Sequence, residues 1–430
     1  MGAVGHEGVR GTEAPLAGIL VADLSRVLAG PLVGQTLADL GARVVKVERP
    51  GAGDDTRSWA PPVSATGSTY FDAANRGKES VTLDLADPAD QALVVELVAR
   101  ADVVIENFRP GTTARLGLDR DALLAAHPRL VWCSISGYGS APGGAERAGY
   151  DFVVQATSGL MHVTGQPDGP PTKAGVALVD VLTGKDATAG ILAALLRRER
   201  TGVGGVVEVA LLSSAQAALV NQLQAVLGAP GSQGEGAWMP AAEPGRSGSA
   251  HPSIAPYQLL ATADAPLAVA VGTDAQFRTL CRAVGRDDLA LDARFATNAE
   301  RVAHREDLVA LLEEALAADT AQAWEARLLA TGLAAGRVRT ISEGLRLAEE
   351  VGLDPVRAVR GPAGAGATLA SPIRIDGDAA TSPMPPPLLG EHDADVRAWL
   401  STPATPRAAD RPGSSVAATD PDADRHRGAP

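Results

Sequence analysis

The chain has 430 residues, of which 45% are hydrophobic and 21% are charged, so it holds enough apolar material for two or three soluble domains. Its 51 Asp and Glu against 38 Lys and Arg give a net charge of −13, which argues against a nonspecific nucleic-acid binder because such proteins need a basic face. The two cysteines, Cys133 and Cys281, exclude a disulfide scaffold and a four-cysteine zinc site, and their apolar surroundings predict buried thiols.

The two ends of the chain have compositions typical of disorder. Residues 1–14 are polar and glycine-rich, and residues 401–430 are rich in Pro, Asp, Ala and Arg without apolar periodicity. The first of these segments lacks the apolar stretch of a signal peptide, and no run of about 18 apolar residues occurs in the chain. We therefore expect no membrane span and a cytoplasmic location.

Strands and helices are expected to alternate through the first half of the chain. Short apolar runs predict strands at Gly18–Leu24, Arg43–Glu48, Ser80–Leu85, Val103–Asn107, Leu130–Ile135 and Ala174–Val179. Periodic segments with capping signals predict helices at Pro31–Leu40, Asp87–Ala101, Asp119–His127 and Thr183–Arg200. This alternation predicts an α/β fold, with a parallel, doubly wound sheet and helices on both of its faces.

The pattern changes in the second half. Residues 228–252 are rich in Gly, Pro and Ser and predict a long loop or linker. Residues 253–335 predict a smaller α+β domain, with strands at Tyr257–Ala261 and Leu267–Val271 and helices at Asp274–Val284, Arg305–Ala317 and Ala321–Thr331. Residues 336–400 return to a mixed pattern, with a helix at Ser342–Val351 and a last helix after His392.

The first predicted strand and helix are joined as in dinucleotide-binding folds, but the glycine fingerprint is incomplete. Only Gly30 and Gly34 are present, and Pro31 stands where a pyrophosphate would need to approach closely. The sequence therefore argues against NAD(P), although a helix N-terminus at this place could still hold a phosphate or an acyl carrier.

Asp180 is the acidic residue that the pattern singles out. It follows the predicted strand Ala174–Val179 and precedes a helix, which places it at the carboxyl edge of the sheet, where ligands bind in open α/β folds. The helix dipole would favour an ionised side chain, and a partly desolvated carboxylate is a competent nucleophile towards an activated acyl group. A plain helix N-cap would suit the same position, and the residues alone leave both interpretations open.

Four arginines, Arg49, Arg57, Arg109 and Arg115, follow predicted strands. Guanidinium groups gathered at one sheet edge would suit a polyphosphate or a carboxylate, whereas each one taken singly also fits a solvated surface. The seven histidines show no metal-ligand spacing, and no G-x-S-x-G motif occurs, so a metal site and a serine hydrolase have no support.

Several stretches, in the same order, resemble the class III CoA-transferases (CaiB/BaiF), the superfamily of formyl-CoA transferase, carnitine CoA-transferase and 2-methylacyl-CoA racemase. The resemblance covers about residues 15–400. The matching stretches are Leu24–Pro31, Leu37–Ala42, Val44–Pro50, Gly53–Arg57, Glu106–Gly111, Gly149–Asp151, Gly169–Pro171, Gly175–Asp180 and Pro387–His392.

The resemblance implies a CoA-transferase in which Asp180 attacks the thioester of an acyl-CoA. A mixed anhydride forms, the CoA thiolate returns to give an aspartyl-CoA thioester, and an acceptor carboxylate then takes the CoA. Coenzyme A would be a substrate, with no permanently bound cofactor and no metal. The CoA-binding residues that the resemblance implies are Leu28, Ala29, Arg49, Leu83, Asp84, Leu85, Asn107, Phe108, Arg109, Arg115, Ala148, Gly149, Tyr150 and Asp151.

The resemblance also implies a large Rossmann-like domain formed by residues 15–227 and 336–400, and a homodimer of two interlocked rings in which both chains build each active site. The stretch between Gly245 and Tyr257 lacks the glycine run of formyl transferases. It is similar instead to members that move succinyl groups between dicarboxylic acids, in which Arg246, Gly248 or His251 would contact the substrate.

Two other functions remain open. The racemase branch shares the Asp at position 180, but it uses a His as its second acid–base group where this chain has Tyr150, and an unperturbed Tyr titrates near 10. A CoA-binding protein without turnover is the other alternative, against which the presence of Asp180 argues.

Overall fold

The computed structural model describes residues 14–228, 243–361 and 364–403. Its centre is a six-stranded sheet in which every pairing is parallel, with the strand order β5-β2-β1-β6-β7-β8. The strands are β1 (Leu20–Asp23), β2 (Arg43–Glu48), β5 (Lys78–Thr82), β6 (Val103–Glu106), β7 (Val131–Ser136) and β8 (Gly205–Ala210). The order reverses between β1 and β6, and the carboxyl ends of these two strands mark the place where doubly wound sheets bind ligands.

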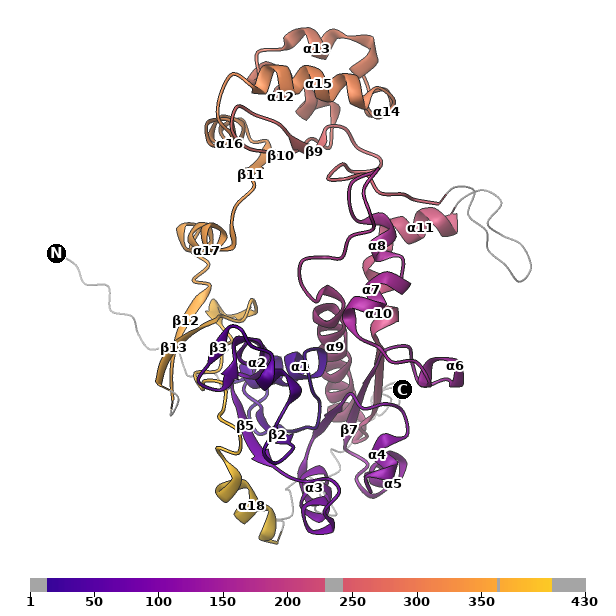
Figure 1. The fold of residues 1–430 in the computed structure, drawn as a ribbon, viewed down its shortest axis with the longest axis vertical. Coiled ribbons are helices and arrows are strands. Elements are labelled where there is room, and N and C mark those ends of the chain that lie inside the picture. Colours follow the sequence, from indigo (N-terminus) through magenta and orange to yellow (C-terminus); the bar gives the residue numbers. More distant parts are fainter. Residues whose placement is uncertain (1–13, 229–242, 362–363, 404–430) are drawn as a thin grey trace, which may run out of the picture.

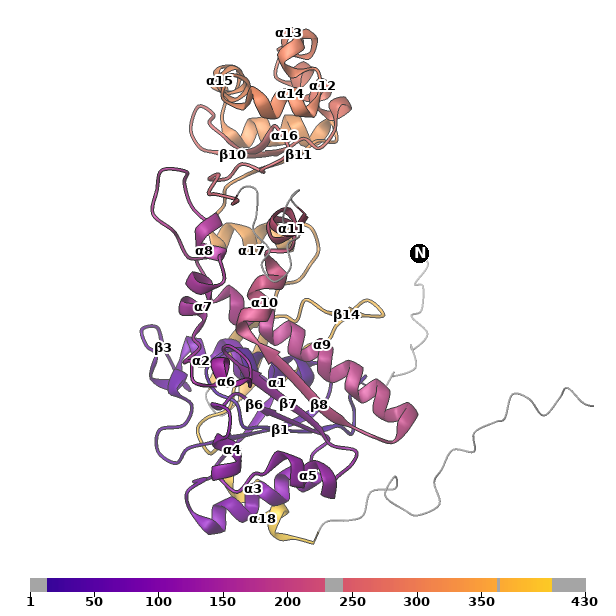
Figure 2. The same ribbon diagram turned by 90° about the vertical axis from the view of Figure 1, so that its right-hand side faces the viewer.

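Helices cover both faces of this sheet (Figures 1 and 2). Side chains on alternate strand positions enter two separate apolar clusters, one beneath α1 (Ala29–Asp39) and α9 (Leu178–Thr201), the other beneath α3 (Pro88–Arg100) and α18 (Asp393–Ser401). Because α18 comes from the far end of the chain, both halves of the sequence build this unit. The predicted doubly wound sheet is confirmed.

A second unit holds its own core. Strands β9 (Tyr257–Leu260), β10 (Leu267–Ala270) and β11 (Ala334–Arg337) form an antiparallel sheet. Its helices are α12 (Asp274–Ala283), α13 (Asp287–Leu291), α14 (Asn298–Ala303), α15 (Arg305–Leu316) and α16 (Ala321–Ala330), with a 3₁₀ turn at Ala293–Phe295. Two connections on opposite sides join this unit to the large sheet, and α17 (Ile341–Glu350) lies on one of them (Figure 1).

The remaining elements are short and surround the large sheet. The helices are the 3₁₀ turn Asp55–Ser58, α2 (Thr69–Asn75), α4 (Thr112–Arg115), α5 (Arg120–Ala126), α6 (Pro142–Ala145), α7 (Asp151–Thr157), α8 (Leu160–Val163), α10 (Leu211–Ala218) and α11 (Val220–Gly228). The strands pair as three hairpins: β3 (Val63–Ser64) with β4 (Gly67–Ser68), β12 (Val356–Gly361) with β13 (Gly364–Leu369), and β14 (Arg374–Ile375) with β15 (Asp378–Ala379).

In the large sheet, one predicted strand is absent and one observed strand was not predicted. Ala174–Val179 is not a strand, because helix α9 already begins at Leu178. Val176 is exposed ahead of the helix, and Val179 is the first of the buried α9 positions that recur every three or four residues. Strand β8 was not expected, although its Val-Val-Glu-Val run alternates between half-buried and exposed side chains.

Other expectations concern the thiols, the membrane and the chain ends. Cys133 and Cys281 are buried free thiols, as predicted. Within the residues that the structure describes, no helix is long and apolar enough to span a bilayer. The predicted disordered segments 1–14 and 401–430 fall almost entirely outside the described residues, as does most of the predicted loop 228–252.

Candidate active site

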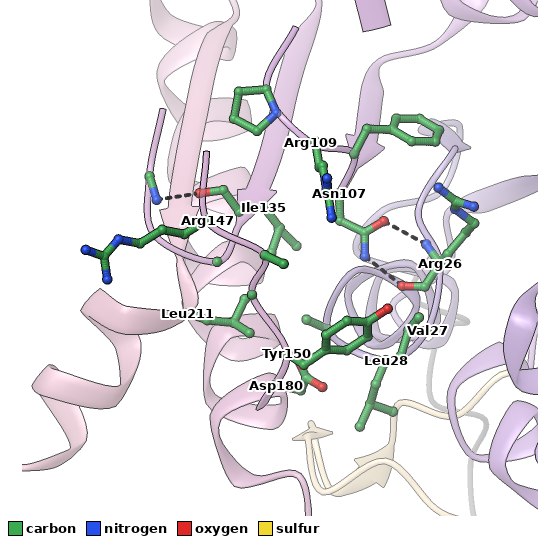
Figure 3. Close-up of a pocket in the computed structure, with 18 of the residues that line it drawn as sticks. Arg26, Val27, Leu28, Asn107, Arg109, Ile135, Arg147, Tyr150, Asp180 and Leu211 are labelled. Carbon is green, nitrogen blue, oxygen red and sulfur yellow. Dashed lines mark hydrogen bonds between the residues drawn. The ribbon is translucent and has the colours of Figure 1, made fainter. Parts of the chain in front are cut away.

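Two neighbouring cavities open where the strand order reverses. The first, of about 280 Å³, is lined from the ends of β1, β6 and β7 and from the start of α9 (Figure 3). The second, of about 260 Å³, lies beside it at the end of β2 and the residues that follow β5. Arg26 and Phe108 line both cavities, and the Arg26 guanidinium stacks 5.1 Å from the centre of the Phe108 ring, so this pair forms the wall between them.

The structure brings together most of the residues singled out from the sequence. The first cavity is lined by Leu28, Ala29, Asn107, Phe108, Arg109, Ala148, Gly149, Tyr150 and Asp180. The second is lined by Arg49, Leu83, Asp84, Leu85 and Phe108. Arg115 lines neither; its exposed side chain turns back to the hydroxyl of Thr112 at the edge of the second cavity.

The loop Ser25–Leu28, which we call the switch-point loop, connects β1 to α1. Its shape depends on Asn107, whose side-chain amide accepts from the Arg26 N–H at 2.9 Å and donates to the Arg26 carbonyl at 2.6 Å. Both bonds are drawn in Figure 3. Helix α1 begins directly after this loop without a side-chain cap, so its first amides are left for another acceptor at the cavity.

Asp180 lies in the first turn of α9, and it is not the N-cap. The helix instead receives its capping acceptor from Asp151 of α7, whose carboxylate accepts from the backbone N–H of Val179 at 2.7 Å and of Asp180 at 3.2 Å. Gly184 allows α9 to pass close to α1, since a Cβ there would stand 3.0 Å from the Ala29 carbonyl oxygen. Packing and capping together fix Asp180 beside the switch-point loop.

The surroundings of Asp180 disfavour the ionised form of its carboxyl. Burial raises the pKa of this carboxyl to about 7, and the negative charge of Asp151 adds to the shift. The helix N-terminus was expected to favour the ionised form, but burial has the larger effect. Asp180 is therefore divided between its two protonation states near neutral pH, which is a feature of groups in active sites.

Tyr70 of α2 faces the same carboxylates and was missed by sequence reasoning. Burial raises the pKa of its phenol, followed by the charges of Asp180 and Asp151. Its ring packs edge-on against Trp59 with a centroid distance of 5.1 Å. No sequence signal linked residue 70 to residue 180, because the two come near each other only in the folded chain, where α2 and α9 both pack against α1. Arg26 was also missed, although it lies within a motif that matched the family.

Not every predicted residue reaches the cavities. Arg57 is buried in a two-pronged ion pair with Glu48, at 2.7 and 2.8 Å, and its guanidinium also covers the Phe71 ring. It therefore holds the fold together and is not available for phosphate. Arg49 does reach the second cavity, where it pairs with Asp55.

The three predicted substrate-loop residues lie away from the cavities described above. Arg246 donates to the carbonyls of His162 and Gln166, and the Gly248 N–H donates to the Gly165 carbonyl. The His251 ring packs against Tyr257 at 5.3 Å between ring centres. Among the described residues, no group of three or more His, Cys, Asp or Glu side chains could hold a metal ion.

Comparisons with known proteins show the family to which the chain belongs. The family model described as CoA-transferase family III matches residues 16–393. The chain is 42% identical to a succinate–glutarate CoA-transferase of Agrobacterium fabrum over 409 residues, which cover 90% of this chain and 96% of that protein. It is 40% identical to an acetyl-CoA:oxalate CoA-transferase of Acetobacter aceti over 335 residues, covering 77% of this chain and 83% of that one.

The crystal structure of a CaiB/BaiF family protein from Brucella suis is similar throughout. The two structures have a TM-score of 0.78 at 41% sequence identity, and the match covers 90% of this chain and all of that one. The family model, the relatives and the fold lead to one conclusion: the chain belongs to CoA-transferase family III and is a CoA-transferase.

Proposed function

We propose that this CoA-transferase moves CoA between an acyl-CoA and a free carboxylic acid through a covalent intermediate on Asp180. The observation that carries the proposal is the position of Asp180, which lines the first cavity beside the switch-point loop and the uncapped start of α1. A carboxylate held there could reach a thioester whose CoA portion occupies both cavities. Covalent catalysis of this kind replaces one difficult displacement by several easier ones.

The proposed steps balance without an external acid or base. The ionised Asp180 carboxylate attacks the thioester carbonyl, and the C–S bond breaks to release CoA thiolate and leave an aspartyl anhydride. The thiolate attacks the aspartyl carbonyl and releases the first acid as its carboxylate. An acceptor carboxylate then attacks the aspartyl-CoA thioester, the thiolate leaves again, and it finally takes the acyl group of the new anhydride, which regenerates Asp180.

The two cavities suit the two ends of CoA. The second cavity has apolar walls at Leu83 and Leu85 and a cation at Arg49, which fits the nucleotide. The first cavity leads past Ala29 to Asp180 and fits the pantetheine arm. We assign Arg26, on the wall between them, to the phosphates that join these two parts of CoA.

For the transferred acids we propose short dicarboxylates. The relative from Agrobacterium is named for succinate and glutarate, and the one from Acetobacter for oxalate. Such acids carry a second carboxylate, which a cation must receive when the first one reacts. Arg246 and His251 are the candidates from the sequence, and they would reach the site only if the segment that carries them moved or came from a second chain.

A homodimer is the second part of the proposal. Helix α17 has an amphipathic sequence, yet none of its residues is buried, and the Ile341 side chain is 88% exposed. Tyr150, which lines the first cavity with Asp180, and Phe152 of α7 are also exposed. Apolar groups left uncovered in this way need a partner surface, and we propose a second copy of the chain. The large domain would then consist of residues 15–227 and 336–400, the small domain of residues 253–335, and the linker between them of residues 228–252.

The test is CoA exchange between succinyl-CoA and glutarate. The variant D180A should lose exchange by at least a factor of a thousand and still bind CoA. Asp186 is an exposed acid on the same helix that accepts a hydrogen bond from Ser214, and D186A should exchange at nearly the wild-type rate. Turnover in D180A would refute the assigned role. Exchange of the α-hydrogen of a 2-methylacyl-CoA with deuterium, without CoA transfer, would move the assignment to the racemase branch.

A further inference from the structure

The backbone of the switch-point loop is held almost entirely by side chains. Five consecutive polar groups of residues 25–27 are bonded in this way. The partners are Asp23 for the Ser25 N–H (3.0 Å), Lys46 for the Ser25 carbonyl (2.9 Å), Asn107 for both groups of Arg26 (2.9 and 2.6 Å) and Asp54 for the Val27 N–H (3.3 Å to each oxygen). A loop whose backbone is bonded by four different side chains in this way has little freedom to change its shape.

Val27, in the middle of this loop, has a strained backbone conformation. Its φ is +72°, in the left-handed region that β-branched residues rarely adopt. A backbone in such a conformation persists only when its surroundings impose it, and positions of this kind occur preferentially at ligand sites. Val27 lines the first cavity, between Arg26 and the start of α1.

Asp54 and Lys46 form the part of the scaffold that acts on Val27. Their side chains are fully buried and pair at 2.9 Å. The same Asp54 carboxylate accepts from the N–H and the hydroxyl of Thr56, at 3.0 and 2.7 Å, which fixes its direction. Lys46 also donates to the Ser25 carbonyl. The ion pair is therefore hydrogen-bonded to the residue before Arg26 through Lys46 and to the residue after it through Asp54.

We infer that Asp54, backed by Lys46, is a positioning residue for CoA: it imposes the left-handed conformation on Val27 and so presets the switch-point loop in its ligand-binding shape. This inference rests on the proposed function only in taking the two cavities as the CoA site, because Val27 lines the first cavity and Asp54 and Lys46 line the second. Asp54 touches no reacting atom in this scheme. It lowers the free-energy cost of ordering the loop when CoA binds.

The conservative variant D54N keeps the size of the side chain but removes its charge. The affinity for CoA should fall about tenfold, and KM for the acyl-CoA should rise by a similar factor while kcat changes less than threefold. The matched control is D102N, because Asp102 is likewise buried and paired, with Arg198 at 2.9 Å, but it lies at the amino ends of the strands, immediately before β6. The control should lose stability without losing CoA affinity.

A second substitution separates positioning from general damage. In the D54N background, V27G should restore CoA affinity to within about threefold of wild type, because glycine adopts the left-handed region without being held there. V27A also removes the contacts of the valine methyl groups, but alanine is still strained at a positive φ. The D54N/V27A variant should therefore still bind CoA weakly. Calorimetric titration with CoA measures all of these constants, and circular dichroism verifies the fold of each variant.

Each outcome decides the inference. Rescue by V27G and not by V27A supports it. Equal affinities in the two double variants, or an unchanged affinity in D54N, would overturn it. If D54N fails to fold because it leaves Lys46 buried and unpaired, K46M/D54N leaves no unpaired charge and serves as the background in its place. Failure of the wild-type protein itself to bind CoA would count against the proposed function, which is a different result.

Discussion

The Asp151 side chain affects both the position and the pKa of Asp180. Asp151 accepts two hydrogen bonds from the first turn of α9, which fixes the backbone of Asp180, and its charge also raises the pKa of the Asp180 carboxyl. The residue-by-residue resemblance pointed to both acids. It could not reveal the capping, because Asp151 and Val179 are 28 positions apart and meet only in the folded chain.

The pH dependence of exchange follows from the raised pKa. If Asp180 must be ionised to attack, kcat/KM should fall about tenfold per pH unit below a pKa near 7 and should level off above it. The variant D151N keeps an acceptor for the helix amides but removes the charge, so the falling limb should move by a few tenths to about one unit to lower pH. A pH–rate profile of both proteins makes the measurement. An unshifted limb would show that Asp151 does not act through its charge.

The same pKa makes Asp180 a source of instability. Its value in the unfolded chain is 3.8, and its folded value is about 7, so ionisation favours the unfolded state. The gap in stability between D180N and the wild type should therefore open from about pH 4, grow until about pH 7 and stay constant above. At pH 8 the variant should be more stable by roughly 1–4 kcal/mol. Denaturant titrations across this range check it, and a gap independent of pH would contradict it.

At the scale of elements, the loop between β7 and α7 sets the position of Asp151. The two ends of this loop cross each other at Gly137 and Gly149. A Cβ on Gly149 would stand 2.3 Å from the Gly137 Cα. Only a residue without a side chain fits so close a backbone contact. The crossing delivers the chain to α7, whose first residue is Asp151.

We expect G149A to force this crossing apart, to lower exchange more than tenfold, and to cost about 1–3 kcal/mol of stability. G143A is its control, because Gly143 lies in the same loop and its Cβ would meet no atom within 4 Å. Exchange rates and thermal unfolding of the two variants provide the comparison. Wild-type behaviour of G149A would mean that the crossing does not control the site.

Periodicity predicted most elements of the large sheet to within a few residues, since buried parallel strands and capped helices carry strong local signals. Arg43–Glu48 is predicted with the bounds that the structure has, and α3 starts at the expected Asp-Pro signal. The segment before Asp180 was predicted as a strand and is not one. A short apolar run is equally compatible with a strand and with the first turn of a helix. Partners distant in sequence, such as Asp23 for Lys78, which are 55 positions apart, left no local signal at all.

At the scale of the whole molecule, the exposed apolar residues of α17 are the observation on which the proposed dimer rests. The proposed dimer should have a mass of about twice 43.8 kDa in solution. The double variant I341D/V351D places two charges on exposed apolar positions and should shift the population towards the monomer, whereas I341L should not. Light scattering after gel filtration measures the masses. A wild-type monomer that exchanges CoA at the full rate would contradict the dimer proposal.

The most direct measurement is the mass of the protein after incubation with succinyl-CoA alone, followed by borohydride reduction and peptide mapping. Because no acceptor is added, the aspartyl-CoA thioester should accumulate, and reduction should convert the side chain at position 180 to an alcohol. The mass change is predicted in the peptide that contains Asp180 and absent from D180N. Modification of another residue, or active exchange with no trapped product at position 180, would contradict the central claim.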